Sequence, residues 1–199
     1  MFNLAESSRF EGDGVLRFQS GADFGSGVVT LGTPVQHASG LWTGTGTVNL
    51  QRPVEFFDGD LESGLVLNVI TNASKTASTT SMDSNTINLI TGLKQSGGIF
   101  SSRSSQVNSA INVKPGVVYE IDVNATILSG DLGDLLTLEA GSTLRKTNAT
   151  GTTTIDWRLV NDGIVDVGSG VLSLSEGAVF NATNRIGTGA ELSLTSGSF

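Results

Sequence analysis

The residues that could do chemistry are few, and most of them are carboxylates. Asp58-Gly59-Asp60-Leu61-Glu62 places three acidic side chains within five residues of a turn. Carboxylates around a glycine can converge on Ca²⁺, which takes about six to eight oxygen ligands. The spacing matches neither an EF-hand loop nor a glycine-rich calcium repeat, and a solvated turn is the alternative. Asp58, Asp60 and Glu62 are therefore the metal-site candidates, with calcium as the ion.

Nucleophilic catalysis would depend on one residue. His37 is the single histidine and cysteine is absent, so a Ser-His-Asp arrangement would have to use His37. It follows Pro34-Val35-Gln36 between two expected strands, and the chain contains no G-x-S-x-G turn. These observations favour a loop histidine without a catalytic role. The lack of cysteine also excludes disulfides and cysteine-based zinc sites.

Glycoside hydrolysis needs two carboxyl groups at a set separation. Asp131 and Asp134 are a second acidic candidate beside the 58–62 turn. The remaining acids are expected on the solvent side of strands, scattered along the chain and without a cluster of Lys or Arg: Asp122, Asp156, Asp166 and Glu191. A carbohydrate-active β-helix enzyme, either a lyase or a hydrolase, is thus an alternative function, and no catalytic residue is predicted.

Other polar and aromatic residues have structural interpretations. Trp42 and Trp157 could stack on sugars. They fall on the same alternate positions as the aliphatic residues that are expected to be buried, which favours core packing. Thr43, Thr45 and Thr47 are expected on one side of one strand. This is an ice-binding pattern, but it does not recur, so ordinary β-propensity explains it. Four Asn-Ala-Ser/Thr triplets match a glycosylation acceptor and are predicted to be turns: Asn72, Asn124, Asn148 and Asn181.

Charge and hydropathy limit the partners. The formal net charge is −8, from 11 Lys and Arg against 19 Asp and Glu, so nucleic acid is not an expected partner. No basic cluster suits an anionic membrane surface. Apolar runs such as Leu65-Val66-Leu67 are far too short to span a bilayer, so no transmembrane segment is expected. The first ten residues do not resemble a signal peptide.

Short alternating segments separated by glycine dominate the chain, which has 26 glycines. Apolar residues recur at every second position, as in Thr47-Val48-Asn49-Leu50, which predicts strands with one buried face. No stretch of helical length shows a 3.6-residue period. The fold class is therefore all-β.

The strands also recur. Apolar pairs starting at positions 136, 155, 172 and 192 are separated by 19, 17 and 20 residues. Such a period predicts a right-handed parallel β-helix, a β-solenoid with rungs of roughly 17–20 residues that stack similar side chains in the lumen. Leu138, Trp157, Leu174 and Leu194 are expected in one column. The alternative is a β-sandwich, because Asp58-Gly59 and Asp162-Gly163 suit hairpin turns.

The chain is expected to form one continuous domain. Residues 1–71 and 109–199 are predicted to be solenoid rungs. Residues 72–108 are predicted to form irregular Ser/Thr-rich rungs, with a long polar loop at residues 74–84.

Two segments carry a resemblance to a known family. Residues 39–48 read W-x-G-x-G-x-V, and residues 157–181 contain L-x-N-x-G-x-V-x-V followed by S-G-x-L-x-L-x-x-G-A-x-F-N. They resemble repeats of large bacterial exported β-strand-repeat proteins, described as autotransporter-like or filamentous-haemagglutinin-like. The resemblance implies an extracellular or cell-surface β-solenoid that serves as a stalk, adhesin or matrix component.

The expected function is therefore a structural or adhesive repeat segment of an exported bacterial surface protein, without catalysis. Expected partners are surface glycans, other cell-surface proteins, and further repeats of a longer parent chain in end-to-end contact. No cofactor is expected apart from the candidate calcium ion.

Overall fold

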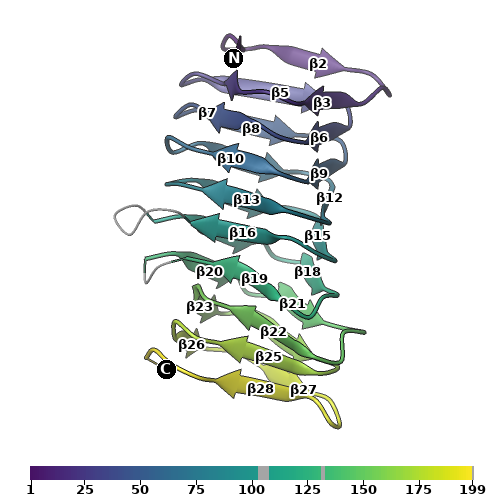
Figure 1. Cartoon of the computed structure of the whole chain (residues 1–199), viewed down its shortest axis with the longest axis vertical. Coiled ribbons are helices and arrows are strands. Elements are labelled where there is room, and N and C mark those ends of the chain that lie inside the picture. Colours follow the sequence, from purple (N-terminus) through teal and green to yellow (C-terminus); the bar gives the residue numbers. More distant parts are fainter. Residues whose placement is uncertain (103–107, 131–132, 199) are drawn as a thin grey trace.

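The computed structural model describes residues 1–102, 108–130 and 133–198, which coil into a parallel β-helix (Figure 1). Every strand pair among these residues is parallel, which confirms the solenoid and excludes the sandwich. Asp58-Gly59 and Asp162-Gly163 turn the chain from one sheet into the next rather than back along a hairpin. The described residues include no helix long and apolar enough to cross a membrane.

Three sheets form the sides of the described solenoid, and each rung passes through them in the order A, B, C. Sheet A contains β1 (Phe2–Asn3), β4 (Ala22–Asp23), β7 (Leu41–Thr43), β10 (Gly59–Leu61), β13 (Thr79–Met82), β16 (Ile99–Ser102), β19 (Thr126–Ser129), β22 (Thr152–Ile155), β25 (Val171–Leu174) and β28 (Glu191–Leu194).

Sheet B follows the first corner of each rung. It contains β2 (Arg9–Glu11), β5 (Val28–Gly32), β8 (Thr47–Leu50), β11 (Val66–Val69), β14 (Thr86–Leu89), β17 (Ala110–Val113), β20 (Leu135–Leu138), β23 (Arg158–Asn161) and β26 (Ala178–Phe180).

Sheet C closes each rung. It contains β3 (Leu16–Phe18), β6 (Val35–His37), β9 (Val54–Phe56), β12 (Asn72–Lys75), β15 (Gly92–Gln95), β18 (Val118–Ile121), β21 (Thr143–Lys146), β24 (Ile164–Val167) and β27 (Asn184–Ile186).

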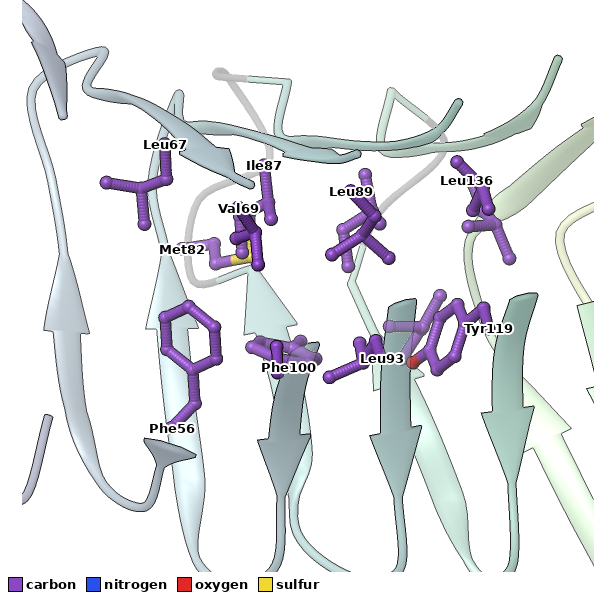
Figure 2. Packing of buried hydrophobic residues seen from close by; sticks show 14 of the residues in the cluster. Phe56, Leu67, Val69, Met82, Ile87, Leu89, Leu93, Phe100, Tyr119 and Leu136 are labelled. Atoms are coloured by element: carbon purple, nitrogen blue, oxygen red, sulfur yellow. The ribbon is translucent and has the colours of Figure 1, made fainter. Parts of the chain in front are cut away.

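The core is a set of columns that run along the solenoid axis. Period-two alternation turns every second side chain into the lumen, and the parallel register places it on its equivalent one rung away. One such column of sheet B passes through Leu67, Ile87, Ile111 and Leu136, all of them buried. Figure 2 labels three of them, Leu67, Ile87 and Leu136. Since one rung cannot bury its own apolar face, this stacking supplies the hydrophobic stabilisation.

The expected column of Leu138, Trp157, Leu174 and Leu194 is wrong. Leu174 and Leu194 do share a column of sheet A with Ile155. Leu138 lies in sheet B and pairs with Asn161, and Trp157 lies at the corner before β23. Alternation predicts which side chains point inward, but it does not say which of three sheets a strand joins.

The expected loop at residues 74–84 is also wrong. Ser74 and Lys75 belong to β12, and residues 79–82 form β13, which pairs in register with β10 and β16. Thr80 and Ser81 are buried. Thr80 points inward in register with the buried Phe100, whereas Ser81 lies on the outer face beside Asp60. A small hydroxyl side chain fits inside a narrow lumen, so a polar sequence here forms an ordinary rung. Residues 103–107, the other end of the region expected to be irregular, lie outside the described residues.

Rung length changes along the solenoid. Contacting residues of neighbouring rungs are separated by 19 positions at Asn49 and Asn68 and by 20 at Asn68 and Asn88. The separation rises to 24 at Asn88 and Asn112 and to 25 at Lys114 and Glu139. The strands of these rungs still pair in register, although the expected period of 17–20 residues is exceeded.

Candidate functional site

The acidic turn lies at the corner between sheets C and A. Asp58 precedes β10, and its Oδ1 accepts a hydrogen bond of 2.8 Å from the Gly59 N–H. Asp60 and Glu62 alternate with the buried Leu61, which places both on the outer face of sheet A. Within the described part of the chain, no three His, Asp or Glu side chains lie close enough to hold a metal ion. Calcium binding at Asp58, Asp60 and Glu62 stays a prediction from the sequence.

His37 points into the lumen, not into a loop. Its ring lies 4.4 Å from the ring of Trp42 at an interplanar angle of 33°, and its Nε2 is 3.1 Å from the Gly40 carbonyl oxygen. Burial lowers the pKa of His37 to about 4, a shift that the contact with the Gly40 carbonyl opposes. The imidazole is therefore neutral at pH 7 and enclosed by the core, which is a structural position.

Lys75 is buried at the same corner, two rungs further along. Its ammonium donates hydrogen bonds to the carbonyl oxygens of Phe57 (3.0 Å) and Ala77 (2.6 Å) and lies 5.7 Å from the centroid of the Phe100 ring. Burial lowers the pKa of Lys75 to about 8, while the Asp58 carboxylate acts in the opposite direction.

Two more buried polar residues repeat this arrangement. Gln95 Nε2 donates to the Gly98 carbonyl (2.9 Å), and Lys146 Nζ donates to the Ala149 carbonyl (2.8 Å). Burial lowers the pKa of Lys146. All four residues occupy the last position of a strand in sheet C and lie in one column. We call this set the corner column: His37, Lys75, Gln95 and Lys146.

The corner column supplies hydrogen-bond donors to backbone carbonyls at the turns. Where the chain leaves sheet C, turn carbonyls point inward, and a buried carbonyl without a donor is costly. A long polar side chain at the preceding inward position supplies the donor. Sequence reasoning missed this column because it assigned polar residues to solvent or loops. The sequence feature that indicates such a residue is a long polar side chain at an inward-facing strand position immediately before a turn.

Asp134 has a similar role at the corner between sheets A and B. It is buried, and its Oδ1 accepts a hydrogen bond of 2.8 Å from the Ser109 N–H. Asn85 accepts from the Leu65 N–H in the same way, also at 2.8 Å. Asp134 is thus engaged with the backbone. Asp131, the other acid of the candidate pair, lies outside the described residues, so the pair stays a prediction.

Both tryptophans are fully buried, which confirms core packing for Trp42 and Trp157. Trp42 packs edge-on against Phe18 and Phe24, with ring centroids 4.9 Å and 5.1 Å away. Neither indole face is open to a sugar. Thr43 and Thr47 lie in different sheets, at the end of β7 and the start of β8, so the expected single row with Thr45 does not form.

Three of the four asparagines of the glycosylation-like triplets lie at or beside turns. Asn148 adopts a φ of 63°, the left-handed conformation that asparagine tolerates. Asn124 Oδ1 accepts from the Gly151 N–H at 2.9 Å, and Asn181 Nδ2 donates to Asp162 Oδ1 at 2.8 Å. Asn72 instead opens β12, so the turn prediction is wrong at that position.

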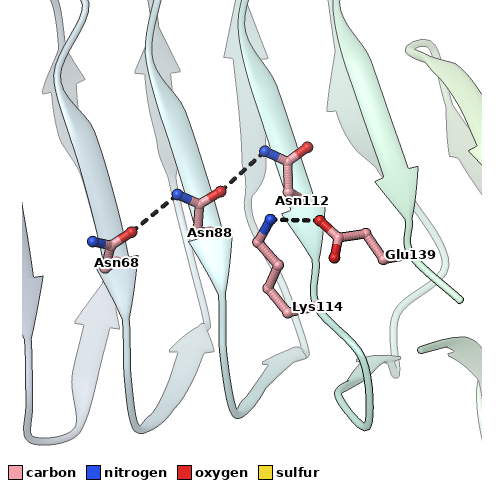
Figure 3. A network of polar contacts seen from close by, with 5 residues as sticks. All are labelled: Asn68, Asn88, Asn112, Lys114 and Glu139. Atoms are coloured by element: carbon pink, nitrogen blue, oxygen red, sulfur yellow. Dashed lines mark hydrogen bonds and ion pairs between the residues drawn. The ribbon is translucent and has the colours of Figure 1, made fainter. Parts of the chain in front are cut away.

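The outer face of sheet B carries a ladder of amides (Figure 3). Asn68 Nδ2 donates to Asn49 Oδ1 at 2.9 Å. Figure 3 shows the next two bonds, from Asn88 to Asn68 (2.9 Å) and from Asn112 to Asn88 (3.0 Å). Lys114 and Glu139 continue the face with an ion pair of 2.5 Å. The sequence signal of the ladder is that the third residues of four equivalent strands, T-V-N-L, V-L-N-V, T-I-N-L and A-I-N-V, are all asparagine.

The outer face of sheet C is instead charged and hollowed. Contacts cross from rung to rung between Gln36 and Glu55 (2.7 Å) and between Lys94 and Glu120 (3.3 Å). Two shallow grooves of about 430 and 340 Å³ adjoin at Asn72 and Ala73 and follow the axis past several rungs.

Comparisons with protein-family models, with curated proteins and with solved structures find no match for this chain. The resemblance of residues 39–48 and 157–181 to exported bacterial repeats therefore stays a prediction.

Proposed function

We propose that this chain is a structural and adhesive repeat segment of an exported bacterial surface protein. The observation that carries the proposal is the in-register stacking of all three sheets along the described chain. Backbone hydrogen bonds join each rung to the next on three sides, and side-chain contacts reinforce them on the outer faces. Such a body keeps a fixed length and direction, which is what a stalk requires.

The burial of the residues that could take part in catalysis supports the proposal. His37, Lys75 and Lys146 contact turn carbonyls inside the lumen, and Asp134 accepts a backbone N–H. These groups serve the corners of the solenoid and are enclosed by it. A catalytic group needs access to its substrate, and burial denies it to these residues.

The adhesive part of the proposal places surface glycans on sheet C. The two adjoining grooves run along the axis, so a linear polymer could follow them, and Lys94 and Glu120 line one of them with polar groups. End-to-end contact with further rungs would cover the apolar side chains on the terminal rungs, Phe2 at one end and Ile186 and Leu194 at the other.

Antibodies raised against the 199-residue chain test this function on intact cells of the source organism. We expect them to label the cell surface before lysis, and brief protease treatment of intact cells to remove the label. A cytoplasmic marker treated in the same way is the control. Labelling that appears only after lysis would overturn the proposal.

Glycan binding is tested separately with a polysaccharide panel. We expect retention of the wild-type chain on at least one linear polysaccharide and weaker retention of Lys94→Ala, with Lys114→Ala on sheet B as the matched control. Depolymerisation of any member of the panel would instead favour the enzymatic alternative.

A further inference from the structure

The outer face of sheet B lacks charge over four consecutive rungs. The outward residues of β5, β8, β11 and β14, together with the residue that follows β8, β11 and β14, form this surface. We call it the amide face: Val28, Thr30, Gly32, Thr47, Asn49, Gln51, Val66, Asn68, Ile70, Thr86, Asn88 and Ile90. Three aliphatic side chains on it are open to solvent, Val28 by 52%, Ile70 by 40% and Ile90 by 44%.

The other two sheets differ on the same rungs. Sheet C carries Glu55 and Lys94 at outward strand positions, and sheet A carries Asp60, Glu62 and Asp83 on or beside its strands. Charges on exposed sheets keep β-proteins from associating. In a chain of net charge −8, an uncharged face with exposed isoleucines is the one place on these described rungs where another sheet could approach without repulsion.

We propose that the amide face packs against the amide face of a second copy of this chain. The asparagine ladder is self-complementary, because a carboxamide has two N–H donors and two acceptor lone pairs. Asn68 and Asn88 each use one donor and one acceptor within the ladder. The remaining groups recur at the rung spacing of ~4.8 Å, and the ladder of a second copy matches that spacing.

Packing of paired sheets is the geometry that such a surface suits. Facing sheets lie ~10 Å apart with interlocked side chains, and asparagine ladders add to their cohesion. A two-fold axis between the copies lets the same residues serve both sides. When the solenoid axes of the two copies run parallel, this two-fold axis runs along them and reverses the strand direction. Ile70 and Ile90 of one copy then leave water along one margin of the interface, and those of the other copy along the opposite margin.

The size of the face sets the strength of the contact. Four rungs at ~4.8 Å and five residues at ~3.3 Å give a projected area of about 320 Å² on each copy. A stable interface buries about 800 Å² on each partner. A single pair of copies is therefore weakly bound, and copies held side by side on one surface associate far more tightly through multivalency. The consequence is lateral bundling of neighbouring solenoids.

Sedimentation equilibrium of the full chain tests this inference. Over loading concentrations from about 10 μM to about 1 mM, which brackets weak affinities, we expect reversible self-association. We expect the double variant Ile70→Lys/Ile90→Lys to lower the association constant at least tenfold. The matched control Thr143→Lys/Ile164→Lys adds the same charge on adjacent rungs of sheet C and should change the constant less than twofold.

Chemical cross-linking gives a readout that does not depend on the lysine variants. The chain has no cysteine, so single cysteines report one position each. With a short bis-maleimide, we expect Thr86→Cys on the amide face to form dimers at least tenfold faster than Ser74→Cys on sheet C. Equal rates for these two variants, or a wild-type chain that stays monomeric to about 1 mM, would overturn the inference. Association that Leu194→Lys abolishes and the amide-face variant does not would assign it to the solenoid ends instead.

Discussion

At the scale of single residues, His37 makes the stability of the fold depend on pH. Its pKa falls from 6.5 to about 4 on folding because the buried ring resists charging. The unfolded chain therefore binds more protons than the folded chain between pH 6.5 and 4, and stability declines as the pH falls through that window. The loss approaches about 3 kcal/mol, since each pKa unit is worth about 1.4 kcal/mol.

The variant His37→Gln isolates this effect. Gln95 shows that glutamine fits the corner column and donates to a turn carbonyl. Urea unfolding at pH 7 and pH 4 should show a smaller loss of stability in the variant than in the wild type, because carboxylates titrate in both and His37 only in the wild type. Equal losses in the two proteins would show that His37 does not titrate in this window.

At the scale of elements, the corners decide whether rungs can stack. Asn85 accepts from the Leu65 N–H and donates to the carbonyl oxygens of Leu61 and Asp83 while fully buried. Asn85→Leu would remove the acceptor of the buried Leu65 N–H and a donor from both carbonyls, of which that of Leu61 keeps the Asp83 N–H, and we expect it to lower the free energy of unfolding by about 3 kcal/mol. Asn49→Leu removes one half-exposed ladder bond and should cost less than about 1 kcal/mol. Comparable losses in denaturant titrations would contradict the role assigned to this corner.

Close approach between rungs also depends on glycine. A Cβ at Gly46 would lie 2.1 Å from the carbonyl oxygen of Gly27, which is backbone and cannot move aside cheaply. Gly46→Ala should therefore lower the free energy of unfolding by about 1–3 kcal/mol. Gly14, with nothing within 4 Å of its Cβ position, is the control, and Gly14→Ala should leave stability unchanged or raise it by up to about 1 kcal/mol. Thermal melts that rank the two variants the other way would show that the rungs are not in close contact at Gly46.

At the scale of the whole molecule, the sequence predicts the solenoid and its inward parity. Val48, Leu50, Leu67 and Val69 are buried as the alternation requires. The assignment of strands to sheets failed, as for Leu138 and Trp157, because parity carries no information about which sheet a strand joins. Rung lengths from 19 to 28 residues also blurred the period.

The candidate site was harder to predict than the fold. Period-two alternation identifies buried positions only when the buried side chains are apolar. Lys75, Gln95 and Lys146 are polar side chains that are nevertheless buried. The amide ladder can be predicted only when the register between neighbouring strands is known, because residues such as Asn88 and Asn112 are 24 positions apart in the sequence. Register depends on corner lengths, which the local pattern does not fix.

The stacking of rungs in solution is tested most directly by distances between spin labels. Cysteines can be placed at outward positions of one sheet B column, with Thr30→Cys as the common label and Thr137→Cys or Val160→Cys as the second. Five and six rung steps separate these pairs, which predicts backbone distances of ~24 Å and ~29 Å. A second distance about one rung longer than the first would confirm linear stacking. A second distance equal to or shorter than the first would contradict the solenoid and the stalk function that rests on it.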